Sequence, residues 1–206
     1  MIMLNFWINN HVRILLVYEA KYFYIRFHMI VEIAKFDSPI GSITLAVCDQ
    51  YLCALSFSES WPSTEVILGR RFGSIDSRKV EDSAGVVDHL KSYFIGSVEA
   101  LSEINVDPGG TQFQRKVWAK LCELQPGETI SYTNLACRVG SPAAVRAVGA
   151  ANGANPIAIV IPCHRVIGAD GRLVGYGGGI ERKQWLLDHE RTHSRRTVIR
   201  KLGKIG

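Results

Sequence analysis

The sequence contains only five cysteines, an odd number, and no two of them form a CxxC pair. This arrangement fits neither a closed disulfide framework nor a zinc knuckle, and it indicates a reducing compartment, so we expect a cytoplasmic protein. Repeats and low-complexity tracts are also missing. With 206 residues, of which 47% are hydrophobic and 21% charged, the chain can bury a substantial core as one large domain or two small ones. A disordered chain, a collagen-like repeat and a disulfide miniprotein are therefore excluded.

Long apolar runs are missing as well. The first 28 residues are aromatic and apolar, but Arg13, Glu19, Lys21 and Arg26 interrupt them. No stretch approaches the ~20 residues that span a bilayer, and no small-residue cleavage site follows as it would after a secretory signal. We therefore expect no membrane partner. We interpret residues 1–28 as an extension ahead of a domain that begins at Met29, and Met29 is a second candidate for the initiator methionine.

Acidic residues are scarce in the second half of the chain. Residues 1–110 contain 9 Lys and Arg against 13 Asp and Glu, whereas residues 111–206 contain 15 against 6. A net charge of +9 is typical of a segment that meets a polyanion, and nucleic acid is the first candidate, although such a charge can also serve solubility alone. Residues 191–206 form a basic tail without acids, which suits either contacts with a DNA backbone or a solvated, disordered segment.

The first half of the chain has the patterns of a small sheet domain. Successive antiparallel strands are predicted at residues 30–36, 42–47 and 51–57. Ser38–Gly41 forms a turn between the first two, and Val86–Phe94 has the apolar face of a helix. The sequence Asp107-Pro-Gly-Gly110 is the preferred boundary, and it separates a domain at 29–106 from a second one at 107–190. Thr111 and Gln114 match a capping box that starts a helix directly after this boundary.

Two short helices separated by a glycine turn are predicted over residues 132–139 and 142–152. Ser131 can cap the first helix, Gly140 ends it, and Pro142 takes its favoured place in the first turn of the second. Helix, tight turn and helix in this order predict a helix-turn-helix.

The second of these helices consists almost entirely of small residues, and Arg146 is its only charged residue. Such a helix can pack tightly inside the protein, or it can lie against another surface such as a DNA groove. A single arginine among alanines is an unfavourable core residue, which favours the second interpretation.

Cys163 stands next to a histidine at the end of an apolar segment. Residues 157–161 predict a short buried strand that ends at Pro162-Cys-His-Arg165. A free thiol titrates near pH ~8.5, so Cys163 would need a nearby imidazole, the charge of Arg165 or a helix N-terminus to become a nucleophilic thiolate. Neighbouring residues of a strand point to opposite faces, so His164 would act through a water or a bent backbone.

The longer motif Ile161-Pro-Cys-His-Arg-Val166 follows Asn155-Pro156 and precedes Gly175-Tyr176, Gly178-Gly179 and Trp185-Leu-Leu-Asp-His-Glu190. This constellation resembles the O6-alkylguanine-DNA alkyltransferases, also called methylated-DNA-protein-cysteine methyltransferases, of bacterial type. The resemblance covers residues 29–190. It implies an α/β (α+β) chain with an N-terminal antiparallel-sheet, ribonuclease H-like domain, followed by a winged-helix-like helical domain that holds the helix-turn-helix.

The resemblance also implies DNA repair by direct damage reversal. The chain would transfer the alkyl group of O6-alkylguanine, with O4-alkylthymine as a further candidate, from double-stranded DNA to its own Cys163, irreversibly and stoichiometrically. His164 matches the residue that removes the thiol proton through a water, Glu190 the carboxylate that orients this imidazole, and Asn155 the residue that braces the backbone. Tyr132 matches the hydroxyl that assists the departing guanine at N3.

DNA handling follows from the same resemblance. Arg146 matches the residue that fills the space left by the flipped base. Small residues would let the second helix enter the minor groove: Ala143, Ala144, Ala147 and Gly149. Tyr176, Gly177 and Gly178 match the loop beside the alkyl pocket, and the missing side chain of Gly177 suggests room for groups larger than methyl.

The resemblance implies no cofactor, because the damaged DNA supplies the alkyl group, and we expect a monomer. Some family members hold zinc in the first domain, but here only Cys48 and Cys53 fall near ligand positions, so we expect no metal. A binding-only sensor of alkylated DNA is one alternative, and the presence of Cys163 argues against it. A cysteine hydrolase is the other; it lacks a recognisable oxyanion-hole loop and leaves Arg146 unexplained.

Overall fold

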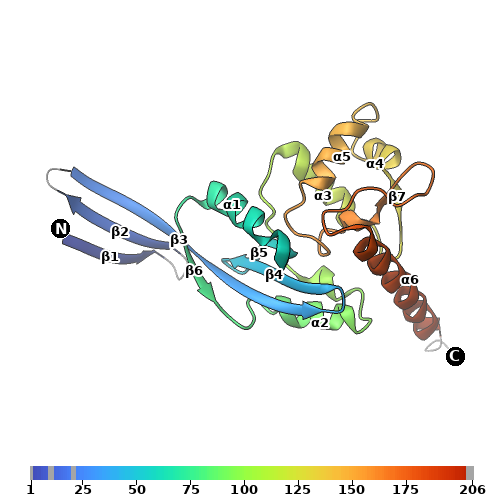
Figure 1. Cartoon of the computed structure of the whole chain (residues 1–206), viewed down its shortest axis with the longest axis horizontal. Coiled ribbons are helices and arrows are strands. Elements are labelled where there is room, and N and C mark those ends of the chain that lie inside the picture. Colours follow the sequence, from blue (N-terminus) through green and yellow to red (C-terminus); the bar gives the residue numbers. More distant parts are fainter. Residues whose placement is uncertain (1, 9–11, 20–21, 203–206) are drawn as a thin grey trace.

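The computed structural model describes the backbone of residues 2–8, 12–19 and 22–202 and the side chains of residues 29–194. It consists of a sheet domain and a helical domain that lie side by side (Figure 1). The first domain contains β1 (Ile2–Ile8), β2 (Val12–Glu19), β3 (Tyr22–Ser38), β4 (Gly41–Cys48), β5 (Tyr51–Phe57), η1 (Ser58–Ser60), α1 (Trp61–Phe72), β6 (Ile75–Lys79), α2 (Val86–Phe94) and η2 (Ala100–Glu103). The second contains α3 (Gln112–Cys122), β7 (Ile130–Ser131), α4 (Tyr132–Arg138), α5 (Val145–Gly153), η3 (Cys163–Arg165), β8 (Val166–Ile167) and α6 (Ile180–Leu202).

The sheet has the order β1-β2-β3-β4-β5, and all neighbours on this path are antiparallel. The three predicted strands and the turn at Ser38–Gly41 are confirmed, and Gly41 adopts φ +117°, which only glycine accepts easily. The sheet is not purely antiparallel as predicted, because β6 pairs in parallel with β3 over Met29–Ile33. Neither β6 nor α1, the helix between β5 and β6, was expected from the sequence.

The predicted extension at residues 1–28 supplies β1, β2 and the first part of β3. These strands continue the sheet away from the rest of the domain, with Ile2 opposite Tyr18 and Val12 opposite Met29 (Figure 1). Their side chains lie outside the described residues. The expectation that the domain begins at Met29 stays a prediction.

The two faces of the sheet are covered by different helices. Ala46 and Cys48 of β4 pack with Leu68 of α1 on one face. The alternate residues of the same strand, such as Leu45, pack on the other face with Leu90 of α2 and with the core of the helical domain. This alternation follows from the period of two in a strand, and it leaves both faces of β4 and β5 buried.

The helical domain has the predicted helix-turn-helix in α4 and α5. Thr111 and Gln114 form both hydrogen bonds of the capping box at α3, and the Ser131 hydroxyl accepts from the amide of residue 134, so both predicted caps are confirmed. The predicted start of the second helix at Pro142 is wrong. Ser141 and Ala144 close a separate turn, and α5 begins three residues later than expected.

The helical domain also contains a short parallel strand pair, which β7 and β8 form over two residues. The backbone of the basic tail is helical up to Leu202, as a continuation of α6. Contacts of this tail with DNA stay a prediction. No helix in the described part of the chain is long and apolar enough to span a membrane.

Candidate active site

The cysteine-histidine pair lies in η3, a single turn of 3₁₀ helix, and all three of its residues are buried. The predicted strand at 157–161 is wrong, because this segment makes only one isolated bridge, from Ile157 to Leu55 of β5, and then turns. Ile159 reverses the chain with φ +70°, a strained conformation for a β-branched residue. The turn sends Cys163 and His164 to different surroundings, one towards a cavity and the other into the protein interior.

Asn155 braces the backbone that leads into this turn. Its Nδ2 donates to the carbonyl oxygens of Ile161 at 2.8 Å and Ile157 at 3.3 Å, and its Oδ1 accepts from the amide of Ile157 at 3.0 Å. Asn152 of α5 donates to the Cys163 carbonyl at 3.5 Å. The cysteine backbone is therefore attached directly to the second helix of the helix-turn-helix.

Glu190 of α6 is the centre of a buried hydrogen-bond network, which we call the Glu190 network. Its Oε1 accepts from His164 Nε2 at 2.9 Å, Arg165 Nη2 at 2.8 Å and the Tyr93 hydroxyl at 3.0 Å. Its Oε2 accepts from Arg165 Nε at 2.9 Å and the Gly127 amide at 3.0 Å. Elements of both domains thus hold one carboxylate behind the cysteine.

Burial and charge determine the protonation of these groups. Burial lowers the pKa of His164 although Glu190 opposes this, so the imidazole is neutral at pH 7. Burial alone would raise the pKa of Glu190, but His164 and Arg165 hold it well below its usual range. With Nε2 as the donor to Glu190, the buried Nδ1 keeps its lone pair, and it has no hydrogen-bond partner among the described residues. The histidine is therefore arranged as a proton acceptor.

Cys163 is 7% exposed, and burial raises the pKa of its thiol. The hydrogen-bonding side chain of Asn155 and the charge of Lys183 oppose this shift. Lys183 of α6 is itself buried, which lowers its pKa to about 8, and its Nζ donates to the carbonyls of Val166 at 2.6 Å and Val174 at 2.7 Å. The thiol thus stays protonated at neutral pH until a base removes its proton.

A cavity of about 480 Å³ between the two domains opens onto the cysteine. This volume lies in the range of sites that hold drug-sized molecules, about 300–1,000 Å³. The structure brings seven of the predicted site residues together around it: Cys163, Asn155, Tyr132, Gly149, Tyr176, Gly177 and Gly178. β5, η1 and α1 of the first domain also contribute to the lining, which was not expected from the sequence.

Residues 174–179 form the loop beside the cavity, which we call the pocket loop, and two of its glycines differ in their surroundings. A Cβ atom on Gly177 would meet nothing within 4 Å, as the sequence analysis suggested. A Cβ on Gly178 would lie 2.3 Å from Cε2 of Phe57 and 2.7 Å from Cε1 of Tyr176. Gly178 is therefore the position at which only a glycine lets the loop lie against β5.

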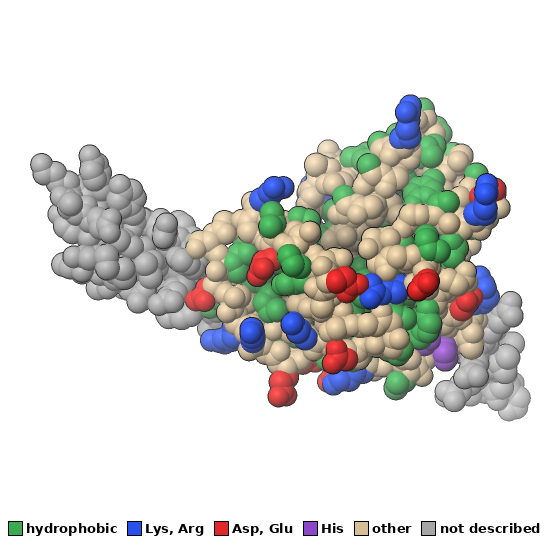
Figure 2. Space-filling model, viewed as in Figure 1, with side chains coloured by type: hydrophobic (Ala, Val, Ile, Leu, Met, Phe, Trp, Pro, Cys, Tyr) green, Lys and Arg blue, Asp and Glu red, His purple; other side chains and the backbone are tan. Residues whose placement is uncertain are grey.

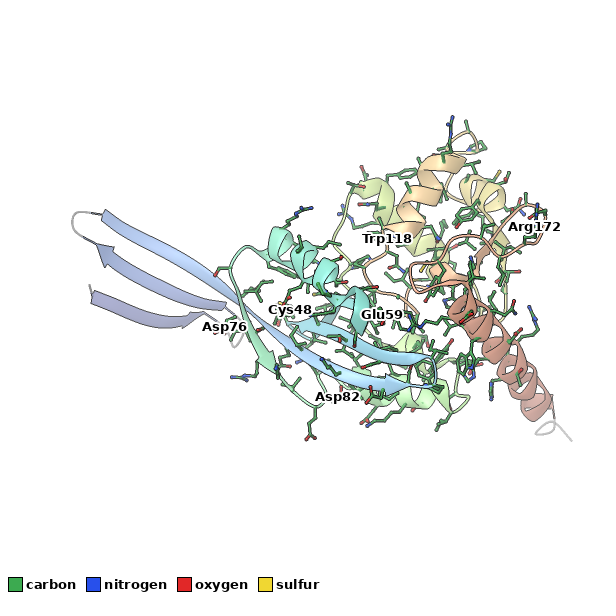
Figure 3. All side chains as sticks on the ribbon, viewed as in Figure 1. Cys48, Glu59, Asp76, Asp82, Trp118 and Arg172 are labelled. Carbon is green, nitrogen blue, oxygen red and sulfur yellow. The ribbon has the colours of Figure 1, made fainter. Side chains whose placement is uncertain are left out.

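Four of the five predicted DNA-contacting residues lie outside the cavity lining, on α5 and in the turn before it, whereas the fifth, Gly149, lines the cavity. Arg146, Ala143 and Ala147 are exposed, while Ala144 is half-buried at the N-terminal end of the helix. Trp118 of α3 (Figure 3) anchors the inner side of α5 by donating from Nε1 to the Ala151 carbonyl at 2.8 Å. The packed and the solvent-facing sides of this small-residue helix are thereby separated. Figure 2 shows Lys and Arg interspersed with Asp and Glu on the viewed face of the molecule.

Sequence reasoning missed four residues of the site: Tyr93, Asn152, Arg165 and Lys183. It considered Arg165 only as a charge beside the thiol, and it assigned Tyr93 only to the apolar face of a helix. The helical spacing of Lys183 with the buried residues Leu187 and Glu190 could have indicated it, because a buried ammonium needs dedicated acceptors. Within the described residues no cluster of three His, Cys, Asp or Glu could hold a metal ion.

The fold and the site together define a helix-turn-helix protein in which a buried cysteine borders a cavity between two domains. The family model of the 6-O-methylguanine DNA methyltransferase DNA-binding domain matches residues 112–192, and that of the ribonuclease-like domain of the same proteins matches residues 31–108. The chain belongs to this 6-O-methylguanine DNA methyltransferase family. The predicted fold class is confirmed with it.

Named relatives agree with this assignment. The methylated-DNA–protein-cysteine methyltransferase of Mycolicibacterium paratuberculosis is 46% identical over 80% of this chain and 94% of its own length. That of Salmonella typhimurium is 42% identical over 76% and 93%. The crystal structure of Mycobacterium tuberculosis O6-methylguanine methyltransferase has a TM-score of 0.67 at 43% identity, over 79% of this chain and 94% of that one. A structure of the Mycobacterium tuberculosis OGT in complex with DNA has a TM-score of 0.66 at 44% identity over the same shares.

Proposed function

We propose that this protein repairs DNA by moving the alkyl group of O6-alkylguanine onto Cys163, once per molecule. The single observation that carries the proposal is the position of Cys163, which lines a cavity while the next residue, His164, is hydrogen-bonded to the buried Glu190 carboxylate. Membership of the family and the names of the relatives support the same reaction. A binding-only sensor would need no acceptor cysteine, and a hydrolase would not need the attachment of the cysteine to a helix-turn-helix.

The reaction follows from the groups around the cavity. His164 Nδ1 takes the thiol proton through a water, and Glu190 stabilises the imidazolium that forms. The Cys163 thiolate attacks the alkyl carbon, the new sulfur–carbon bond forms as the carbon–O6 bond breaks, and the bonding pair stays on the guanine. Tyr132 donates a hydrogen bond or proton to guanine N3, which lowers the cost of this charge. Guanine in the DNA and an S-alkylcysteine are the products.

DNA binding is assigned to the exposed side of α5. Its small residues permit a close approach to the minor groove, and Arg146 is long enough to fill the space of a base rotated into the cavity. Gly149 lies at the inner edge, where a Cβ would be 3.7 Å from the Tyr132 ring, so the helix and the pocket are in contact. We further propose a domain boundary near residue 107, which the two family matches at 31–108 and 112–192 support.

We also propose that the protein acts as a monomer in the cytoplasm. Every group used in the reaction comes from one chain, and Cys48, Cys53, Cys122, Cys137 and Cys163 are all free thiols, which suits a reducing compartment. O4-alkylthymine is a further candidate substrate, since its alkyl carbon is also bonded to an exocyclic oxygen of the base.

Intact mass and peptide mapping test the proposal directly. After incubation with a duplex that contains one O6-methylguanine, one methyl group should be found on Cys163, and none after incubation with undamaged duplex. Cys163→Ala should bind DNA and accept nothing, whereas Cys137→Ala, which removes an exposed thiol, should react like the wild type. Lesion-selective binding without an adduct would favour a sensor. The absence of both binding and adduct would contradict the proposal altogether.

A second variant tests base flipping. Arg146→Ala should slow repair of the duplex lesion more than reaction with the free O6-alkylguanine base, because only the duplex requires a flipped base. Equal losses on both substrates would contradict the role given to Arg146.

A further inference from the structure

Arg182, in the first turn of α6, connects the two domains beside the cavity. Its Nε donates to the carbonyl of Ile40 in the β3–β4 turn at 2.7 Å, and its Nη1 donates to the carbonyl of Gly178 at 3.2 Å. Nη1 also forms an ion pair with Glu59 of η1, and the guanidinium lies 3.9 Å above the centre of the Phe57 ring. Four contacts from three segments of the sheet domain and one pocket loop thus meet at one side chain.

Two of these partners line the cavity that opens onto Cys163. Phe57 belongs to β5 and Gly178 to the pocket loop, and the two are in direct contact, because a Cβ on Gly178 would lie 2.3 Å from the ring. The guanidinium contacts the ring face and the loop carbonyl at the same time. Its position therefore determines how far the loop lies from the sheet domain.

The pocket loop is held at its two ends by neighbouring residues of α6. Lys183 holds the beginning through the carbonyls of Val174 at 2.7 Å and Gly175 at 3.3 Å, within the helical domain. Arg182 holds the end of the loop through the carbonyl of Gly178. Unlike Lys183, Arg182 also donates to the sheet domain, at Ile40, and so attaches the loop to that domain. In the first domain, Gly41 makes room for the guanidinium, since a Cβ there would lie 2.8 Å from Nη2.

We propose that Arg182 is a positioning residue that sets the width of the alkyl pocket, and with it the size of O6-substituent that reacts best. The proposal rests on the function proposed above, which gives the cavity its substrate. A planar guanidinium can donate to two carbonyls and stack on a ring at once, and neither a lysine nor an apolar side chain can do all three.

Loss of the guanidinium should loosen Phe57 and Gly178 together. The small methyl group depends on a confined pocket for its approach to the sulfur, whereas a benzyl group fills a wider one. A misplacement of about 1 Å can slow a reaction by up to about 10²-fold, so we expect methyl transfer to fall by about 10-fold and benzyl transfer by less.

Arg182→Met is the test variant, because it keeps an apolar stem of similar length, and Arg182→Lys is the conservative one. Arg172→Met is the matched control, since Arg172 also pairs with a carboxylate, that of Asp170, but its side chain is 84% exposed and it lies in the outer loop (Figure 3). Rate constants are measured with duplexes that contain O6-methylguanine or O6-benzylguanine, at a temperature at which each variant is folded by circular dichroism.

The ratio of benzyl to methyl transfer should rise several-fold in Arg182→Met, rise less in Arg182→Lys and stay at the wild-type value in Arg172→Met. A merely structural role would slow both transfers alike, so an unchanged ratio in Arg182→Met would overturn the proposal.

Hydrogen exchange gives a readout that does not depend on the transfer reaction. The Gly179 amide donates to the Tyr176 carbonyl at 3.0 Å, so it reports on the end of the loop that Arg182 holds. Its exchange should be faster in Arg182→Met than in the wild type, and unchanged exchange would overturn the proposal. If the wild type transfers no alkyl group, the proposed function fails, while the exchange experiment still decides whether Arg182 positions the loop.

Discussion

Replacing Glu190 by glutamine should be among the most destabilising single changes in this protein. The carboxylate is fully buried and accepts five hydrogen bonds, from His164, Arg165 (two), Tyr93 and Gly127. A glutamine of the same shape presents an NH₂ group to at least two of these donors, whichever way its amide is turned. It also leaves the guanidinium buried, at 6% residue exposure, without an anion.

The size of this effect can be estimated from the structure. Removal of one partner of a buried ion pair costs about 3–5 kcal/mol, because the remaining charge is left without compensation. That is a large part of the ~5–15 kcal/mol by which a domain is stable. With an m-value of about 2 kcal/mol/M, the urea midpoint should fall by about 2 M.

Urea unfolding at pH 7.5, followed by circular dichroism, measures the change, and Tyr93→Phe is the matched control. This control removes one of the five donors but keeps the charge, so it should cost only about 1.5 kcal/mol. If Glu190→Gln unfolds at the same urea concentration as Tyr93→Phe, the charge of Glu190 does not hold the Glu190 network together, and the reasoning is refuted.

Two other predictions concern pH and the pocket loop. Burial lowers the pKa of both His164 and His189, whereas an unfolded histidine titrates near ~6.5, so the unfolded chain binds more protons in acid. The free energy of unfolding should therefore be highest above pH ~6.5 and should fall below this pH, by up to ~1.4 kcal/mol per pH unit for each histidine. A urea midpoint that is constant from pH 7.5 to 5.5 would contradict this prediction. Gly178→Ala should cost about 1–3 kcal/mol and slow alkyl transfer, because its Cβ overlaps Phe57, whereas Gly177→Ala should leave both nearly unchanged. Equal unfolding temperatures and equal transfer rates for the two variants would show that the loop does not lie against β5.

Features set by local hydrogen bonds could be predicted from the sequence. The capping box of Thr111 and Gln114, the cap at Ser131 and the turn at Ser38–Gly41 each involve residues at most three positions apart, so their patterns are readable in the chain itself. The motif around Cys163 also predicted the family, because it lies on one continuous segment.

The segment before the cysteine shows where local patterns fail. Residues 157–161 are apolar and four of the five are β-branched, which predicts a strand, but only Ile157 pairs with β5 and Ile159 turns the chain at positive φ. Asn155 stabilises this turn by satisfying two of its carbonyls, and no periodicity reveals such a contact. The start of α5 at Val145 instead of Pro142 has a similar cause, since a separate turn closes first.

By itself, the sequence predicted the cysteine–histidine pair as the reactive site, the helix-turn-helix, and the strands β4, β5 and the second half of β3. Only the tertiary structure decided that Tyr93 meets Glu190 across 97 positions, that Lys183 holds the pocket loop, and that Arg182 reaches Ile40 across 142 positions. The periodicity of apolar residues predicts which side of a helix or strand is buried, but it does not predict which residues pack against that side. The partners of buried polar groups are set by the packing of the two domains, and these partners shape the cavity that Cys163 lines.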